Sequence, residues 1–192
     1  MNIDQTRLDD DVAYRFEYVS EFMGFTEEDV EVIHSLAPAL GPLVPGLVDA
    51  VYERLFRHPE LRAYFAKPQD GYDGELPGGD VDLDADVIQY RKGHLARYLE
   101  ALVTKPYDAS MVQFLDGVGK RHTEHAGSPQ VSVPLVHITA LMGFVGDALT
   151  ATIAGAGLEH DDEIAAIRAV GKLLWIQHDL MSRHQVNEPQ PA

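Results

Sequence analysis

The sequence predicts an all-α protein of six to eight helices in a single domain. Apolar residues recur at spacings of three and four along most of the chain, which is the periodicity of one helix face. No stretch alternates apolar and polar residues convincingly enough to predict a strand, and segments rich in proline and glycine separate the periodic stretches. A chain of 192 residues is long enough to bury a substantial core.

The composition is typical of a globular protein and excludes several classes of function. Apolar residues make up 45% of the chain and charged residues 24%. The chain has no cysteine, which rules out disulfides, thiolate catalysis and zinc–thiolate sites. Its net charge of −16 opposes binding to nucleic acid or to an anionic membrane. Without a long uninterrupted apolar run or a secretory signal, we expect a cytoplasmic protein with no membrane span.

The first half of the chain divides into an extension, two helices and a loop. Residues 1–25 are predicted to form an N-terminal extension with one marginal helix. Thr26 begins the main domain, since the run TEED is a variant of the capping box. A second helix is expected over residues 45–57, where His58-Pro59 ends it. Residues 67–83 are rich in Gly, Asp and Pro and are predicted to be a surface loop.

The second half contains four predicted helices. The first covers residues 84–103, and the second begins after Asp108, a plausible N-cap. The third begins near Pro134, with Ser132 as its cap, and the last extends from about 159 to 184. The main domain is therefore expected over residues 26–185, and residues 186–192 as a disordered tail.

The helix that follows Asp108 carries the main functional signal. Met111, Leu115, Val118 and His122 are spaced by four, three and four residues, which places them on one helix face. A histidine that ends an apolar stripe is either a buried side chain bonded to a neighbouring carbonyl or a ligand, for example of haem iron. Periodicity alone leaves both open. Gly119 is expected to let a flat macrocycle approach this helix.

Other metal and catalytic sites have weaker support. His125 lies three residues after His122, but a catalytic zinc site needs a further ligand, and Glu124 points to another face. Alternating aspartates from Asp80 to Asp86 imitate a calcium loop that lacks its glycine and has Arg91 where its glutamate belongs. The remaining histidines are interpreted as core, interface, boundary or surface residues. His184 is expected at a boundary or on the surface. No phosphate-binding or hydrolase motif is present.

Four segments together resemble one known family: LVDAVYERLFRHPELRAYF, YRKGHLARYLEALVTKPYD, FLDGVGKRH and SVPLVHITALMGFVGDALTAT. The chain is similar to the protoglobins and to the haem domains of globin-coupled sensors over most of its length. The resemblance implies a globin-like helical sandwich with an N-terminal extension, holding one haem b. His122 would be the proximal iron ligand and Tyr52 the distal hydrogen-bond donor. The other residues implied to contact the cofactor are Val51, Leu95, His94, Phe144, Val118 and Phe65.

The resemblance leaves three functions to weigh. The first is reversible binding of a diatomic gas (O₂, CO or NO) by a stand-alone protoglobin or a single-domain gas sensor. The second is a haem enzyme at the same site, such as a nitric oxide dioxygenase or a peroxidase-like oxidase with an external electron donor. The third is a haem-free helical regulatory module, which retention of His122 argues against. Relatives imply a homodimer through the last two long helices, where Gly143 and Gly146 would permit close approach.

Overall fold

The computed structural model describes residues 3–124 and 131–185, and all regular secondary structure in this part of the chain is helical, with no strand. It contains eight α-helices of six residues or more, and two of a single turn. The long ones are α5 (Val44–Phe56), α7 (Asp86–Thr104), α8 (Ala109–Lys120), α9 (Leu135–Ala154) and α10 (His160–Ser182). Shorter elements are α3 (Glu27–Ser35), α4 (Ala37–Leu40), α6 (Pro59–Arg62) and the 3₁₀ turns Gly41–Leu43 and Ala63–Ala66. The predicted all-α class and helix number are confirmed.

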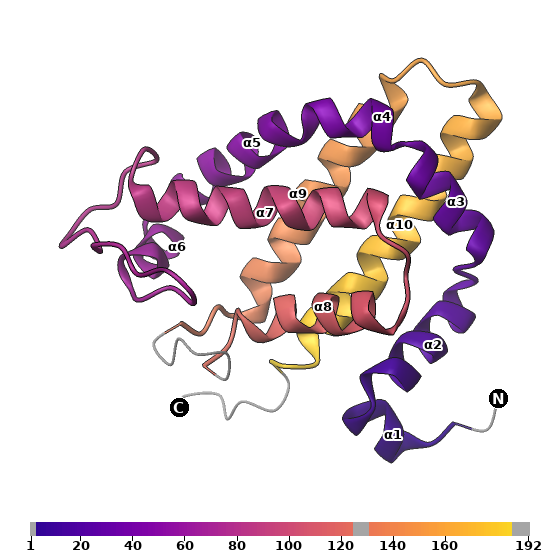
Figure 1. Cartoon of the computed structure of the whole chain (residues 1–192), viewed down its shortest axis with the longest axis horizontal. Helices are drawn as coiled ribbons and strands as arrows, with labels where there is room; N and C mark the ends of the chain where they lie inside the picture. The colour runs from indigo at the N-terminus through magenta and orange to yellow at the C-terminus, as the bar shows by residue number, and fades with distance from the viewer. Residues whose placement is uncertain (1–2, 125–130, 186–192) are drawn as a thin grey trace.

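The helices pack in two crossing layers (Figure 1). In this view α5 and α7 lie side by side, and α9 and α10 cross behind them at a steep angle. The last helix is the centre of the packing, because it contacts α3, α8 and α9. Its buried face carries eight residues, among them Ala166, Leu173, Ile176 and Leu180. Two of the eight, Ala166 and Ala169, are small and allow the neighbouring helices to approach closely.

The N-terminal region forms two helices rather than the single one predicted. These are α1 (Gln5–Asp10) and α2 (Val12–Met23), and Asp11 both ends the first and caps the second with its side chain. The guanidinium of Arg15 donates to both carboxylate oxygens of Asp179 at 2.6 and 2.7 Å, which ties α2 to α10. Helix α2 also packs on α8. Where the extension ends and the main domain begins stays a prediction.

Two predicted N-caps are present, and a third differs. Thr26 and Asp29 form the capping box of α3, and Asp29 also accepts a hydrogen bond from Lys172 of α10 at 2.8 Å. Asp108 accepts from the backbone N–H groups of Ser110 and Met111 at the start of α8. Helix α9 begins at Leu135 with Pro134 in the cap position, so Ser132 is not its cap. Proline fits there because its extended backbone precedes the first helical residue.

Helices α8 and α10 meet in an unusually close contact at Gly119. A Cβ atom on this glycine would lie 2.8 Å from the Cα atom of Met181 and 2.9 Å from the carbonyl oxygen of Leu180. Any other residue at this position would therefore have to displace the backbone of α10 or α8. Gly119 faces α10 and allows this helix contact. The prediction is that it lets a flat macrocycle approach, and the contact with α10 is a different reason for a glycine here.

A buried carboxylate reinforces the same contact. Asp116 of α8 is 3% exposed, and its Oδ1 accepts hydrogen bonds from Arg183 and His184, each at 2.7 Å. Burial alone would raise the pKa of Asp116, but the bonds from His184 and Arg183 outweigh it and lower the pKa to about 2. Arg183 also donates to the backbone carbonyl of Asp9. His184, expected at a boundary or on the surface, is only 13% exposed and part of this network.

Two helical stretches are long and apolar enough to cross a membrane by length and composition. The first, from Glu27 to Phe56, is divided among α3, α4, a 3₁₀ turn and α5. The second is α9, of which little is buried although it packs against α10 and α5. Core helices of soluble proteins pass the same test. The expectation of no membrane span therefore stays a prediction.

Candidate functional site

The periodicity predicts that His122 lies within the helix, but in the structure it lies just beyond the end of α8. The helix ends at Lys120, and the backbone N–H of His122 donates to the carbonyl of Gly119 at 3.0 Å. The carbonyl of Val118, which would accept that N–H in a continuing α-helix, instead accepts from the His122 ring. The hydroxyl of Thr123 donates to the Lys120 carbonyl in the same turn. Competition from these side chains explains why the helix ends here.

The imidazole of His122 is held in one orientation. Its Nδ1 is 2.8 Å from the carbonyl oxygen of Val118, and because a carbonyl only accepts, Nδ1 carries the proton. No hydrogen-bond partner of Nε2 is found in the part of the chain that the structure describes. Burial, with smaller effects from the charges of Arg91 and Arg121, lowers the pKa of His122 to about 4. At neutral pH the ring is therefore uncharged, with the lone pair of Nε2 available to a metal.

Tyr52 lies in the middle of α5 and is buried. Its ring centroid is 5.7 Å from that of Phe65, which comes from the 3₁₀ turn after α6. Burial raises the pKa of Tyr52 to about 12, although the charge of Arg91 and a hydrogen bond from it act in the opposite direction. The phenol is therefore a protonated donor over the whole physiological pH range.

Arg91 is a site residue that the sequence reasoning missed. This α7 side chain is near enough to lower the pKa of Tyr52, His94 and His122 by its charge. Its Nε is buried and has no hydrogen-bond partner in the described part of the chain. The signal was its position four residues before Leu95, on the same face of the helix. An arginine whose buried Nε–H lacks a partner fits an anionic group.

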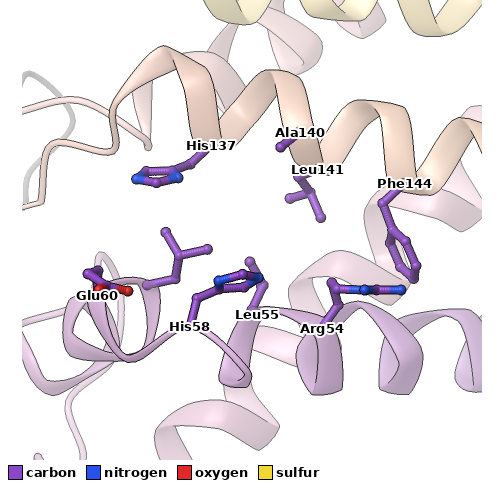
Figure 2. A pocket seen from close by; sticks show the side chains of 9 residues that line it. Arg54, Leu55, His58, Glu60, His137, Ala140, Leu141 and Phe144 are labelled. Carbon is purple, nitrogen blue, oxygen red and sulfur yellow. The ribbon is translucent and has the colours of Figure 1, made fainter.

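The other predicted residues are divided between this site and its surroundings. Val51 is buried beside Tyr52, whereas Leu95 and Val118 are partly buried. The ring of His94 packs at 4.3 Å from that of Tyr90, and burial together with Arg97 and Arg91 lowers its pKa. Phe144 of α9 lies over the guanidinium of Arg54 in a separate pocket (Figure 2). Their roles stay predictions.

Rival metal sites find no support in the described residues. That part of the chain holds no group of three or more His, Asp or Glu side chains arranged to bind a metal ion. His125, the partner considered for a shared zinc site, lies outside the described residues.

The residues present fit a haem group. His122 offers an oriented neutral nitrogen, Tyr52 a buried hydroxyl, and Arg91 a buried Nε–H without a described partner, which suits an acidic substituent. They come from three different elements, α5, α7 and the turn after α8, and globin folds hold a haem in a pocket between packed helices. A helical sandwich with such a histidine defines the class of globin-like haem proteins.

Comparisons with known proteins agree with this class. Residues 12–190 match the family described as Protoglobin, and the chain belongs to this family. Among solved structures, the globin domain of the Geobacter sulfurreducens globin-coupled sensor superposes with a TM-score of 0.70 at 22% identity. The match covers 90% of this chain and 97% of that one, which confirms the globin-like fold. A search of curated proteins found no match. Family membership implies a haem cofactor and supports haem-based gas binding in general.

Proposed function

We propose that the protein binds haem b through His122 and reversibly binds a diatomic gas (O₂, CO or NO) on the opposite face. The observation that carries this proposal is the imidazole of His122, which is neutral, fixed through Nδ1 and free of a described partner at Nε2. Haem supplies a ferrous iron with one open coordination position when a single histidine binds it. The protein would act as a stand-alone protoglobin or a single-domain gas sensor.

Each polar residue has a distinct part in this proposal. His122 holds the group from one side, with its ring orientation set by the Val118 carbonyl. Tyr52 would donate a hydrogen bond from its hydroxyl to the gas ligand, since its pKa of about 12 keeps it protonated. Arg91 pairs with an acidic substituent of the porphyrin, which satisfies its buried Nε. Val51, Leu95, Val118, Phe65 and Phe144 supply apolar walls that exclude water.

The test of the proposal is removal of the imidazole. We expect His122→Ala to abolish stoichiometric haem uptake, measured from the Soret absorption of the reconstituted chain. His122→Gly should recover it when free imidazole is added, which a merely misfolded variant would not do. His160→Ala, which removes an exposed histidine at the start of α10, is the matched control and should take up haem normally. A Soret band of normal intensity in His122→Ala would place the iron ligand elsewhere.

The enzymatic alternative at the same site gains no specific support. Nitric oxide dioxygenation or peroxidase-like oxidation would use the same His122 and Tyr52, and nothing else in the described residues indicates a route for electrons. Binding without turnover is therefore the proposal. The proposal includes a cytoplasmic location, and the net charge of −16 argues against nucleic acid and anionic membranes as partners.

A homodimer through α9 and α10 is the second part of the proposal. Val136 on α9 and Trp175 on α10 are 66% and 63% exposed, and Ile164 on α10 is 42% exposed. The hydroxyl of Thr139 lies 2.9 Å from Nε2 of His178, whose ring contacts Trp175, so residues of both helices share one face. A Cβ on Gly143 would meet no atom within 4 Å, whereas Gly146 packs near Leu174 of the same chain. Large exposed apolar residues of this kind support self-association.

A further inference from the structure

A pocket of about 470 Å³ lies between α5, α6 and α9, apart from the proposed haem site (Figure 2). Its volume is in the range of small-molecule sites, about 300–1,000 Å³. Neither His122 nor Tyr52 lines it; among the residues that the proposed haem site uses, Phe144 is the one that both share. The pocket therefore has to be explained by its own side chains.

The polar side chains of this pocket are mainly bases. Arg54 of α5 and His58, the N-cap residue of α6, project into it from one side, and His137 projects from α9 on the other (Figure 2). The guanidinium of Arg54 is held over the Phe144 ring, 4.9 Å from its centroid. No carboxylate forms an ion pair with Arg54 within the described residues, although Glu60 also lines the pocket. Arg54 is thus free to receive an anion.

The remaining lining is apolar. Leu55, Leu61 and Leu141 also line the pocket. Figure 2 shows Leu141 projecting from α9 toward the side of the pocket on which Leu55 lies. Three nitrogen-bearing side chains around such walls stand in contrast to a chain with 31 acidic and 15 basic residues. A general anion site would not need the leucines, and a site for a purely apolar molecule would not need Arg54.

We propose that this pocket binds a small amphipathic carboxylate, with its charged group at Arg54 and its hydrocarbon tail against the leucines. Arginine recognises a carboxylate with two parallel N–H donors, and the histidine rings add further donors beside it. The apolar tail gains by leaving water for the leucine-lined walls. Phe144 lines this pocket, and on the proposed function it is also a wall of the haem site, so an occupant would touch a residue common to both.

Octanoate is the probe, titrated by calorimetry into the full-length, haem-loaded chain. We expect one molecule bound per chain, and at least tenfold weaker binding of octanamide, which has the same tail without the charge. Arg54→Gln should weaken octanoate at least tenfold. Arg57→Gln removes an exposed arginine of the same helix end that does not line the pocket, and it should leave the affinity within twofold.

A second variant separates loss of the site from loss of the fold. Ala140→Trp fills the pocket from an exposed position of α9 and should abolish octanoate binding with an unchanged circular dichroism spectrum. Absence of octanoate binding to the parent chain overturns the proposal. So does equal binding of octanamide, or an Arg54→Gln variant that binds as the parent does.

Discussion

We expect the selectivity between O₂ and CO to depend on the hydroxyl group of Tyr52. It is a buried, protonated donor with a pKa of about 12. Bound O₂ accepts a hydrogen bond strongly because it is partly anionic, whereas CO accepts weakly. We expect Tyr52→Phe to speed O₂ dissociation roughly 10- to 100-fold, the equivalent of a hydrogen bond to a charged group. Stopped-flow rates for O₂ and CO check this, and an unchanged O₂ rate would remove Tyr52 from the site.

Asp116 makes a prediction about acid stability. Its folded-state pKa of about 2 lies below the ordinary value of 3.8, so its contribution to stability is complete above 3.8. That contribution is lost as the pH falls from 3.8 towards 2. Asp116→Asn should lower the free energy of unfolding at pH 7 by about 3–5 kcal/mol, because Arg183 is left without its buried partner.

Denaturant unfolding at pH 7 and across the acid range measures both effects of Asp116→Asn. Asp147→Asn, on an exposed position of α9, is the control and should change the stability by less than about 0.5 kcal/mol. If Asp116→Asn and the parent chain lose the same unfolding free energy as the pH falls, other carboxylates cause the loss.

At the scale of elements, the contact between α8 and α10 depends on Gly119. Gly119→Ala should destabilise the protein by about 1–3 kcal/mol, because its Cβ would overlap the backbone of α10. Gly117→Ala in the same helix meets no atom within 4 Å and should be neutral or stabilising by about 0.5–1 kcal/mol. Thermal unfolding of the two variants makes the comparison, and equal midpoints would contradict the close contact.

The elements themselves were largely predictable, and the exceptions have local causes. Periodicity and caps located α3, α5, α7 and the start of α8, because these signals lie within a few residues of each other. The end of α8 was missed, since it depends on a histidine ring that competes for the Val118 carbonyl. Arg91 was also missed, because its importance comes from neighbours on α5 and beyond α8 that no local pattern reveals.

At the scale of the molecule, the exposed face of α9 and α10 predicts a dimer that one charge should dissociate. Trp175→Glu should weaken self-association by about 2 kcal/mol or more, which is roughly a 30-fold rise in Kd. Phe22→Glu changes the more exposed Phe22 on α2 and should leave association unchanged. Sedimentation velocity over a concentration series gives both values, and a parent chain that stays monomeric would contradict the proposed interface.

The whole fold was predicted more fully than the site. Helix-forming periodicity is distributed along the chain, so an error at one end of a helix leaves the class unchanged. The close approach at Gly119 and the network of Asp116 join residues more than sixty positions apart. Such pairings follow from tertiary packing, and the sequence alone contains no rule that couples them.

The bond from the His122 ring to the Val118 carbonyl has a consequence for mutational robustness. Its acceptor belongs to the main chain, so exchanging the side chain at position 118 does not remove it. If His122 binds the cofactor as proposed, a ring already held by the Val118 carbonyl loses less rotamer entropy on binding. The side chain at position 118 can therefore change in size or shape while the orientation of the His122 ring is kept.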